Sequence, residues 1–372
     1  MQNKVLFISN TAVFSRFNIP FMRWFKQQGW QVDYVSDGKI KIKDCDNQYA
    51  IPIKRSPYNP NNINAYKRLK KIMMNEYDII HCHTPMGGVL GRLAAKNIRI
   101  KTKVIYTAHG FHFYHGAPLI NWLLFYPIEK QLAKYTDILI TINDEDYNIA
   151  KKNISLCENV CKVNGVGVDL ERFKPCDENE KKQLRQDFDI NESDFVILYV
   201  AEFTPRKNHK LIINSIIKLN EKIKNLKIIF AGTGPLLDKY KNKIKNIGLT
   251  KTVLFLGYRN DIEKLCNIAD IGFSPSKQEG LPIGVVEYIA SGLPVVCSNI
   301  RGHVDIVKDK KNGFLFDLNK PEQMIDAITK LYENTNFKNI LIENNLKERD
   351  KYSHNIAIQK MEEIYKQCML SM

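Results

Sequence analysis

Phe195-Val-Ile-Leu-Tyr-Val200 is apolar along its whole length, and a helical pattern follows it at about 208–222. Strands of this kind have both faces buried, as in parallel sheets that are covered by helices. The same alternation continues along the chain and predicts an α/β fold. Further strands are expected near 226–231, 252–256, 270–273 and 294–297, with helices near 235–247, 260–268 and 283–291.

An earlier run of the same kind begins at Lys4-Val-Leu-Phe-Ile-Ser9. The chain has 372 residues, which is enough for two domains of ordinary size. We therefore predict two doubly wound, Rossmann-like domains whose ligands bind at the carboxyl ends of the strands. The first run has expected strands near 31–36, 78–83, 103–108 and 137–142, and helices near 17–28, 62–76, 87–98, 118–135 and 144–153.

The boundary between the two runs is placed at Asn164-Gly-Val-Gly-Val-Asp169 and the polar stretch 174–194, both interpreted as linker. From 320 to 370 the pattern is helical, and Ser353 is a suitable N-cap for a final helix. The predicted domains are residues 1–170 and 171–352. The C-terminal helix, 353–372, is predicted to cross back to the first domain.

The composition is that of a soluble globular protein, with 44% hydrophobic and 26% charged residues. No apolar run approaches the ~20 residues that cross a bilayer, and the first strand is too short for a signal peptide. The eight cysteines form no paired C-x-x-C array. They are interpreted as reduced thiols of a cytoplasmic protein, and a zinc site is not expected.

The net charge of +15 is unevenly distributed. Residues 1–175 carry 25 Lys and Arg against 14 Asp and Glu, a net charge of +11, and the remainder carries 30 against 26, a net charge of +4. Such a basic half favours an acidic partner, either nucleic acid or an anionic membrane surface. Because no RNA-binding or helix-turn-helix motif is present, the membrane is favoured. A lysine-rich composition that only maintains solubility is the alternative.

The stretch Glu279-Gly-Leu-Pro-Ile-Gly-Val-Val-Glu287 predicts an anion site at the start of a helix. Pro282 suits the first helical position and Gly292 suits the C-cap. Glu279 would lie in the loop beside the anion, and Glu287 would lie one turn into the helix. Two carboxylates on either side of a phosphate suit a nucleotide-sugar; the alternative is a capped helix with two solvated glutamates.

Other polar groups follow neighbouring strands. Arg206 and Lys207 come after the strand at 195–200, where a diphosphate requires cations, although a solvated basic turn is equally possible. Ala231-Gly-Thr-Gly-Pro235 is a tight turn open to phosphate or base, but it lacks the third glycine of a dinucleotide fingerprint. Arg259 either contacts a nucleobase or pairs with Asp261.

In combination these segments resemble the family-four retaining glycosyltransferases, whose glycosyltransferase-B fold places two Rossmann-like domains across a cleft. The resemblance covers nearly the whole chain, since Val163-Asn-Gly-Val-Gly-Val-Asp-Leu-Glu-Arg-Phe173 is similar to the family's interdomain linker. Thr107-Ala-His-Gly-Phe-His-Phe-Tyr114 resembles the branch of bacterial capsule and exopolysaccharide enzymes. The remaining matches are Arg206-Lys207-Asn208, Ala231-Gly-Thr-Gly-Pro235, Leu256-Gly-Tyr-Arg259, Asp270, Ser274-Pro-Ser276, Glu279 to Glu287, Ala290-Ser-Gly-Leu-Pro-Val-Val296, Arg301-Gly302 and Asn312-Gly313.

The resemblance implies roles in donor binding. Glu279 would hold hydroxyls of the transferred sugar, Glu287 would bind the ribose, and Lys207 with Arg206 would neutralise the diphosphate. Many members carry Gly-Arg where this chain has Ala201-Glu202, so Arg206 is expected to carry more of the phosphate contact. The predicted donor-binding set is Gly280, Leu281, Pro282, Ile283, Glu287, Gly232, Gly234, Tyr258 and Arg259.

His109, after the strand at 103–108, matches the family's active-site histidine, which implies that it reaches the donor sugar. It completes a predicted catalytic set with Glu279, Lys207 and Arg206. His81 is interpreted as packing. The segment 111–126 is rich in aromatic and aliphatic residues and is either a buried helix or an amphipathic element at a membrane surface. The predicted acceptor-side residues are Ser15, Arg16, His83, Phe111 and His112.

The predicted function is transfer of a hexosyl or N-acetylhexosaminyl unit, with retention, from a UDP-sugar to a saccharide on undecaprenyl diphosphate. The product would serve capsule, exopolysaccharide or O-antigen synthesis at the inner face of the plasma membrane. No metal, no other cofactor and no nucleic-acid partner is expected. The alternatives are a UDP-sugar 2-epimerase of related fold, a pyridoxal-phosphate-dependent phosphorylase and a basic nucleic-acid-binding module.

Overall fold

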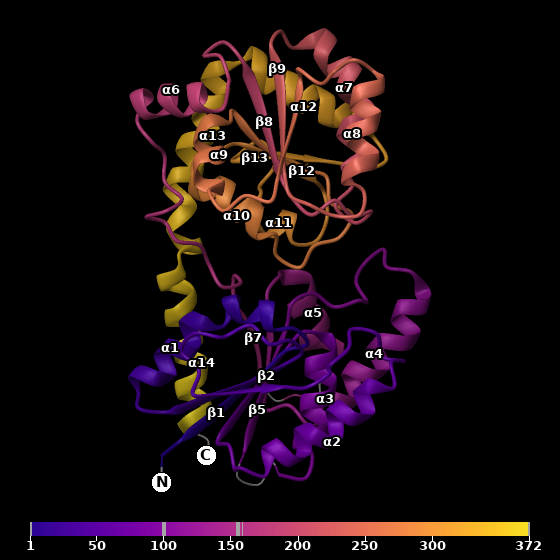
Figure 1. Ribbon diagram of the computed structural model, residues 1–372, viewed down its shortest axis with the longest axis vertical. Coiled ribbons are helices and arrows are strands. Elements are labelled where there is room, and N and C mark those ends of the chain that lie inside the picture. The colour runs from indigo at the N-terminus through magenta and orange to yellow at the C-terminus, as the bar shows by residue number, and fades with distance from the viewer. Residues whose placement is uncertain (1, 99–101, 154–156, 158, 371–372) are drawn as a thin grey trace. The chain divides into compact units, whose positions relative to one another are not determined.

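The computed structural model describes residues 2–98, 102–153, 157 and 159–370. The chain divides into two compact units, and each has a parallel sheet with helices packed against it (Figure 1). The first unit comprises Met1–Val166 and Ala357–Met372, and the second comprises Gly167–Ile356. The prediction of two doubly wound α/β units is therefore confirmed. The eight cysteines are all free thiols.

The first unit contains a seven-stranded sheet in the order β3-β2-β1-β4-β5-β6-β7, and every neighbouring pair is parallel. Its strands are β1 (Lys4–Ile8), β2 (Gln31–Ser36), β3 (Asn47–Ala50), β4 (Ile79–His83), β5 (Lys103–Ala108), β6 (Ile138–Thr141) and β7 (Asn159–Lys162). Its helices are the 3-10 helix η1 (Ala12–Phe17), α1 (Ile19–Gln27), α2 (Asn61–Met73), α3 (Pro85–Ala95), α4 (Leu119–Ala133), α5 (Asp144–Asn153) and most of α14 (His354–Leu370).

The second unit contains a six-stranded parallel sheet in the order β10-β9-β8-β11-β12-β13. Its strands are β8 (Phe195–Val200), β9 (Leu226–Ala231), β10 (Val253–Gly257), β11 (Ile271–Ser274), β12 (Val295–Ser298) and β13 (Gly313–Phe316). Its helices are α6 (Glu178–Asp187), α7 (Lys210–Lys222), α8 (Leu237–Asn246), α9 (Ile262–Ile268), α10 (Ile283–Ala290), α11 (His303–Ile306), α12 (Pro321–Glu333), α13 (Thr335–Glu348) and the 3-10 helix η2 (Arg349–Tyr352).

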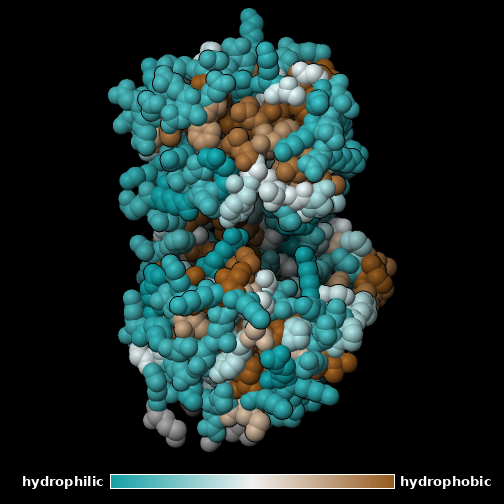
Figure 2. Space-filling model, in the orientation of Figure 1, coloured by the Kyte–Doolittle hydropathy of each residue, from teal (hydrophilic) through white to brown (hydrophobic). Residues whose placement is uncertain are grey.

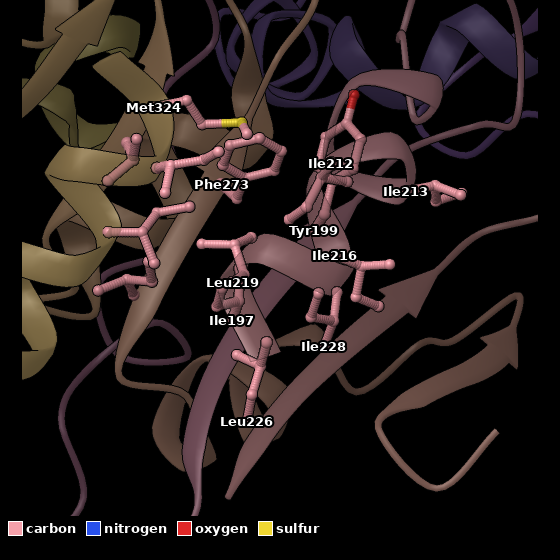
Figure 3. Close-up of a cluster of buried hydrophobic side chains, with 14 of the residues drawn as sticks. Ile197, Tyr199, Ile212, Ile213, Ile216, Leu219, Leu226, Ile228, Phe273 and Met324 are labelled. Atoms are coloured by element: carbon pink, nitrogen blue, oxygen red, sulfur yellow. The ribbon is translucent and has the colours of Figure 1, made fainter. Parts of the chain in front are cut away.

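Burial of β8 on both faces explains why this strand is apolar throughout. Ile197 and Tyr199 lie in one core cluster, whose side chains from α7, β9 and β11 are drawn in Figure 3. Val196 and Leu198 lie in a second cluster, which includes side chains of α9 and α10. Alternate side chains of a strand point to opposite faces, so a continuous apolar run fills both cores.

Three strands were not predicted, namely β3, β7 and β13. Each lies at the edge of its sheet, where one side has no neighbouring strand. Asn47–Ala50 and Asn159–Lys162 are partly exposed and contain little apolar sequence. Their strand conformation depends on pairing with β2 and β6, which a local pattern does not contain.

The interpretation of 174–194 as linker is wrong. Within it α6 forms a helix that belongs to the second unit, and its only buried residues are Leu184 and Arg185. Arg185 donates to the carbonyl of Ile268 and pairs with Asp270 at 2.9 Å. Because a charged side chain anchors this helix, the segment lacks the apolar periodicity that identifies most packed helices.

The final helix starts as predicted. The hydroxyl of Ser353 accepts from the backbone N–H of Ile356 at 3.2 Å, as an N-cap does. From Ala357 onward α14 belongs to the first unit, where Met361, Ile364 and Tyr365 are buried. Helix α14 thus completes the core that the first 166 residues begin.

Candidate active site

In the second unit, the predicted donor residues lie at the point where the strand order reverses. The sheet runs from β8 outward to β10 on one side and from β11 outward to β13 on the other. The loop after β8 carries Arg206 and Lys207, and the loop after β11 carries Glu279. In doubly wound sheets, the loops at the carboxyl ends of these two central strands form the ligand-binding crevice.

Glu279 accepts hydrogen bonds from both cations. Lys207 Nζ lies 2.5 Å from its Oε1, and Arg206 Nη1 lies 3.0 Å from its Oε2. The Glu279 side chain is 7% exposed, whereas those of Lys207 and Arg206 are 20% and 47% exposed. The three predicted catalytic residues of this unit therefore form one cluster, with one carboxylate between two cations.

The carboxylate of this cluster is ionised. Burial by itself would raise the pKa of Glu279, but the charges of Lys207 and Arg206 together hold it below its ordinary value. Two positive charges against one negative charge leave a net charge of +1 on the three side chains. A positive charge in excess is what a site for an anionic ligand requires.

Backbone contacts hold the two loops together. The N–H of Lys277 donates to the carbonyl of Arg206 at 2.9 Å, and Asn208 Nδ2 donates to the carbonyl of Pro275 at 3.2 Å. The hydroxyl of Tyr199 donates to the carbonyl of Lys207 at 2.6 Å. The position of Lys207 is thus fixed by its own backbone as well as by Glu279.

The helix after Glu279 begins at Ile283, as the expected range 283–291 has it, but Pro282 does not occupy its first helical position. Pro282 is the N-cap, with φ −78° and ψ 103°, and α10 starts at Ile283. The C-cap is Ser291, and Gly292 follows it with φ +82°. The nonhelical ψ of Pro282 excludes it from the first turn, and a left-handed residue just beyond a helix is a common position for glycine. Gly280, Leu281 and Ile283 are partly buried around this turn, and Glu287 is half-buried in α10.

Two residues after β12 support the Glu279 loop, although no individual role was predicted for either. Arg301 Nε donates to the carbonyl of Glu279 at 3.1 Å, and Arg301 is buried. Gly302 has φ +83°, and a Cβ atom there would lie 2.6 Å from the carbonyl oxygen of Gly280. Only glycine permits this close approach. The family motif Arg301-Gly302 was the sole signal in the sequence.

The turn after β9 packs closely against the loop after β8. A Cβ atom on Gly232 would lie 2.0 Å from the carbonyl oxygen of Ala201, and one on Gly234 would lie 2.7 Å from the nitrogen of Phe203. Both glycines have positive φ, of +150° and +146°. They therefore allow two neighbouring loops to meet, and their contact with a nucleotide stays a prediction.

Beyond β10, Tyr258 and Arg259 differ in their surroundings. Tyr258 is 69% exposed. Arg259 forms two hydrogen bonds with Asp261, at 2.8 and 2.5 Å, and its guanidinium lies 5.4 Å from the ring centre of Phe188. Two interpretations of Arg259 were open. The structure shows the ion pair with Asp261, and contact of Arg259 with a nucleobase stays a prediction.

In the first unit, three histidines lie at the carboxyl ends of the adjacent strands β4 and β5. His83 Nδ1 lies 3.1 Å from His109 Nε2. His81 is fully buried between the Tyr365 hydroxyl, at 2.7 Å, and the Thr107 hydroxyl, at 2.8 Å. Burial lowers the pKa of His109 to about 4 and that of His81 to about 3, so both are neutral at physiological pH.

The other predicted acceptor-side residues differ in how far they are exposed. Ser15 is buried in η1, while Arg16 is exposed with its guanidinium 4.7 Å from the ring centre of Phe17. Phe111 is 3% exposed and lies in the hydrophobic core. His112 is half-buried, with its ring 4.6 Å from that of Phe125.

The segment 111–126 has one side in the core and another side that is exposed, and its contact with a membrane stays a prediction. Phe113 is buried, and Trp122, Phe125 and Tyr126 pack against the core of the first unit. The opposite side of α4 is apolar and exposed, and hydrophobic residues gather over this helix in Figure 2. The exposed residues are Leu119 (73%), Ile120 (55%), Leu123 (63%), Leu124 (43%) and Ile128 (44%).

Among the residues that the structure describes, no three His, Cys, Asp or Glu side chains are arranged to hold a metal ion. Within the same residues, no helix combines the length and apolar character that crossing a membrane requires.

Two family models match the chain. One, described as glycosyl transferases group 1, matches residues 180–348 and so includes Arg206, Lys207 and Glu279. The other, described as glycosyl transferase 4-like, matches residues 4–143 and includes His83 and His109.

Relatives match over most of the chain. EpsD of Bacillus subtilis (strain 168) is 40% identical over 98% of this chain and 97% of its own length. Its name classes it as a glycosyltransferase and specifies neither a donor nor an acceptor. An Escherichia coli protein named UDP-Gal:alpha-D-GlcNAc-diphosphoundecaprenol alpha-1,3-galactosyltransferase is 33% identical over 72% of this chain and 69% of its own.

A solved structure has the same fold. HepE from Anabaena, crystallised with UDP and glucose, superposes with a TM-score of 0.79 at 17% identity, over 98% of this chain and all of that one. The two parallel sheets, the ionised cluster at the strand reversal of the second sheet and the matches above lead to one conclusion: this chain belongs to the group 1 and 4-like glycosyltransferases and has the glycosyltransferase-B fold.

Proposed function

We propose that this glycosyltransferase moves a hexosyl or N-acetylhexosaminyl unit from a UDP-sugar to a saccharide on undecaprenyl diphosphate, in capsule, exopolysaccharide or O-antigen synthesis. The observation that carries the proposal is the cluster of Glu279, Lys207 and Arg206. Its two cations exceed its one carboxylate, and it lies at the carboxyl ends of β8 and β11, where a diphosphate donor would bind.

In this proposal the donor diphosphate replaces Glu279 as the hydrogen-bond partner of Lys207 and Arg206. The diphosphate takes the hydrogen bonds of Lys207 and Arg206, and Glu279, released from them, accepts from hydroxyls of the transferred sugar. The amides of the turn at 280–283 surround the phosphates, and Glu287 binds the ribose. Gly232 and Gly234 border the nucleotide, and Tyr258 and Arg259 lie toward the base.

The relatives support the choice of donor and acceptor. The Escherichia coli relative takes its name from UDP-Gal and a diphosphoundecaprenol acceptor, and HepE was crystallised with UDP-glucose as well as with UDP. A uridine diphosphate leaving group fits the positive cluster described above.

We propose a retaining reaction without a metal or another cofactor. Lys207 and Arg206 would stabilise the charge that grows on the departing diphosphate, which is the role a metal ion has in other transferases. In this proposal Glu279 binds hydroxyls of the transferred sugar and is not a nucleophile, so attack by the acceptor on the same face as the leaving group is preferred to a covalent intermediate.

The exposed side of α4 supports a location at the inner face of the plasma membrane, where a lipid-linked acceptor resides. A helix with exposed aliphatic residues can lie in the interfacial region of a bilayer. Helix α4 is anchored to α3 by the buried Arg92, which lies 2.8 Å from Glu129. The net charge of +11 on residues 1–175 adds attraction to anionic lipids.

Replacing both Leu119 and Leu123 by Ser should weaken binding to vesicles that contain anionic lipid by at least about tenfold. Each leucine contributes roughly 1 kcal/mol when its exposed surface enters the bilayer interface. Co-sedimentation of the full chain with such vesicles measures the effect. Ile217→Ser with Ile247→Ser is a matched control in the second unit, because these isoleucines are also exposed. Equal binding by the two double variants would exclude α4 as the contact.

Gly302→Ala should lower kcat/KM by about tenfold or more and destabilise the fold by about 1–3 kcal/mol, because a methyl group there displaces the Glu279 loop. The control is Gly248→Ala. Gly248 also has positive φ, +73°, but nothing lies within 4 Å of the position that an added methyl group would occupy. Initial rates and urea unfolding measure both variants. Equal losses in the two would mean that backbone strain alone, and not the loop contact, is responsible.

The proposed function is tested by calorimetric titration of the protein with UDP- and GDP-sugars, followed by transfer assays with a saccharide on undecaprenyl diphosphate. Binding of a UDP-sugar and acceptor-dependent release of UDP are expected. Binding of GDP-sugars only would overturn the donor assignment. Interconversion of UDP-sugars without any acceptor would favour a 2-epimerase.

A further inference from the structure

His83 is a buried polar group in contact with the predicted active-site histidine. It is 2% exposed, and its ring packs near those of Phe7, 6.1 Å away and nearly parallel, and Phe14, 5.6 Å away. The ring of His81 is 4.0 Å from it on β4. These contacts leave His83 little freedom to rotate, so its orientation toward His109 is fixed by packing.

The two nitrogens of His83 have different surroundings. Nδ1 lies 3.1 Å from His109 Nε2, whereas Nε2 is buried and has no hydrogen-bond partner among the described residues. Burial, with the neighbouring His81 and His109, lowers the pKa of His83 well below its ordinary value, so the ring carries a single proton. That proton occupies either Nδ1 or Nε2.

The choice between the two nitrogens is decided by the cost of a buried donor without a partner. A proton on Nε2 would leave an N–H group with nothing to accept it, and such orphaned donors are rare in protein interiors. A proton on Nδ1 makes a hydrogen bond to His109 and leaves only an unpaired acceptor at Nε2. The second arrangement is therefore the stable one.

We propose that His83 is a positioning residue, which donates from Nδ1 to Nε2 of His109 and so fixes His109 in the tautomer that is protonated on Nδ1. His109 is only half-buried. Its Nδ1–H then acts as a hydrogen-bond donor to a ligand oxygen. The identification of that oxygen with a hydroxyl of the transferred sugar rests on the proposed function above. The tautomer itself rests only on the contacts within the first unit.

The arrangement also explains why His81 takes a different role. Its two nitrogens are both satisfied, by the hydroxyls of Tyr365 and Thr107. Hydroxyl groups can donate or accept, so they impose no tautomer on His81. His83, with one contact and one orphaned nitrogen, has only one favourable protonation site, and it transmits that choice to His109.

Long-range 1H–15N correlation spectra of the full-length protein, labelled with 15N-histidine, report the protonated nitrogen of each of the eight histidines. The His109 signals are assigned as those lost in His109→Gln. We expect His109 to be protonated on Nδ1 in the unliganded native protein. Protonation on Nε2 would overturn the proposal, and this measurement requires no variant at His83 and no substrate.

Two substitutions of His83 give a matched comparison. His83→Asn retains an amide group at the position of Nδ1, while His83→Phe retains the ring but removes every donor. The Nδ1–H tautomer of His109 should persist in His83→Asn and be lost in His83→Phe. The latter should lower kcat/KM by about 10- to 100-fold, mainly through kcat, with His83→Asn within about fivefold of native.

The outcomes separate this inference from the proposed function. If His83→Asn and His83→Phe have the same tautomer of His109, the positioning role is wrong, whatever the activity. If His83→Phe does not fold, the spectrum of the native protein still tests the proposal, because it reports which nitrogen of His109 is protonated. The native protein could have the Nδ1–H tautomer of His109 and yet transfer no sugar from any UDP-sugar. That result would support the role of His83 and contradict the proposed function.

Discussion

Glu279→Gln is expected to lower kcat/KM for sugar transfer by about 100- to 1,000-fold, the range seen when one preorganised polar group of an active site is removed. The variant keeps the size of the side chain and removes its charge. Lys207 and Arg206 then lose the negative charge between them, and the hydroxyls of the transferred sugar lose a charged hydrogen-bond acceptor. The measurement is the initial rate of transfer from the UDP-sugar identified by calorimetry.

The fold should tolerate this change. Arg206 is 47% exposed, so water solvates its charge when Glu279 becomes neutral, and we expect the free energy of unfolding to fall by no more than about 2 kcal/mol. Glu322→Gln is a matched control, since Glu322 is 69% exposed in an ion pair with Lys218 at the surface. Activity of Glu279→Gln within threefold of native would refute the assigned role.

Lys207→Met is expected to raise the Kd for UDP by about 30- to 100-fold and to lower kcat/KM by at least as much. A charge-assisted hydrogen bond to a phosphate contributes roughly 2–3 kcal/mol, and the contact strengthens as charge grows on the leaving group. Arg206→Met should have a smaller effect, about tenfold, because the more exposed Arg206 is better screened by solvent. Calorimetry with UDP and initial-rate kinetics measure both.

The control for Lys207→Met is Lys222→Met, which removes a charge from the last turn of α7. The double variant Lys207→Met/Glu279→Gln adds a direct test of coupling. Because the two side chains form one ion pair, their effects should not add, and the double variant should lose less than the product of the single losses. Strictly multiplicative losses would mean that the 2.5 Å contact has no part in donor binding.

The order of the elements was predictable because interior parallel strands have both faces buried. Leu6, Ile80 and Ile197 each follow this rule, and a continuous apolar run separated by helices identifies such strands without any knowledge of their neighbours. The edge strand Asn47–Ala50 and the helix Glu178–Asp187 have no such run, because pairing at one edge and a buried arginine hold them. Local periodicity contains neither kind of contact.

The candidate site divides in the same way. The sequence by itself determined which chemical groups lie at the end of which strand: two cations after β8, a carboxylate and a Gly-Leu-Pro turn after β11, and histidines at the ends of β4 and β5. Only the tertiary structure decided that Lys207 pairs with Glu279, 72 residues away, and that His83 contacts His109, 26 residues away. Tertiary structure also placed Phe111 in the core and left one side of α4 exposed. The physical reason is strand order: β8 lies beside β11 and β4 beside β5 through backbone hydrogen bonds, and no property of a single segment specifies which strand becomes its neighbour.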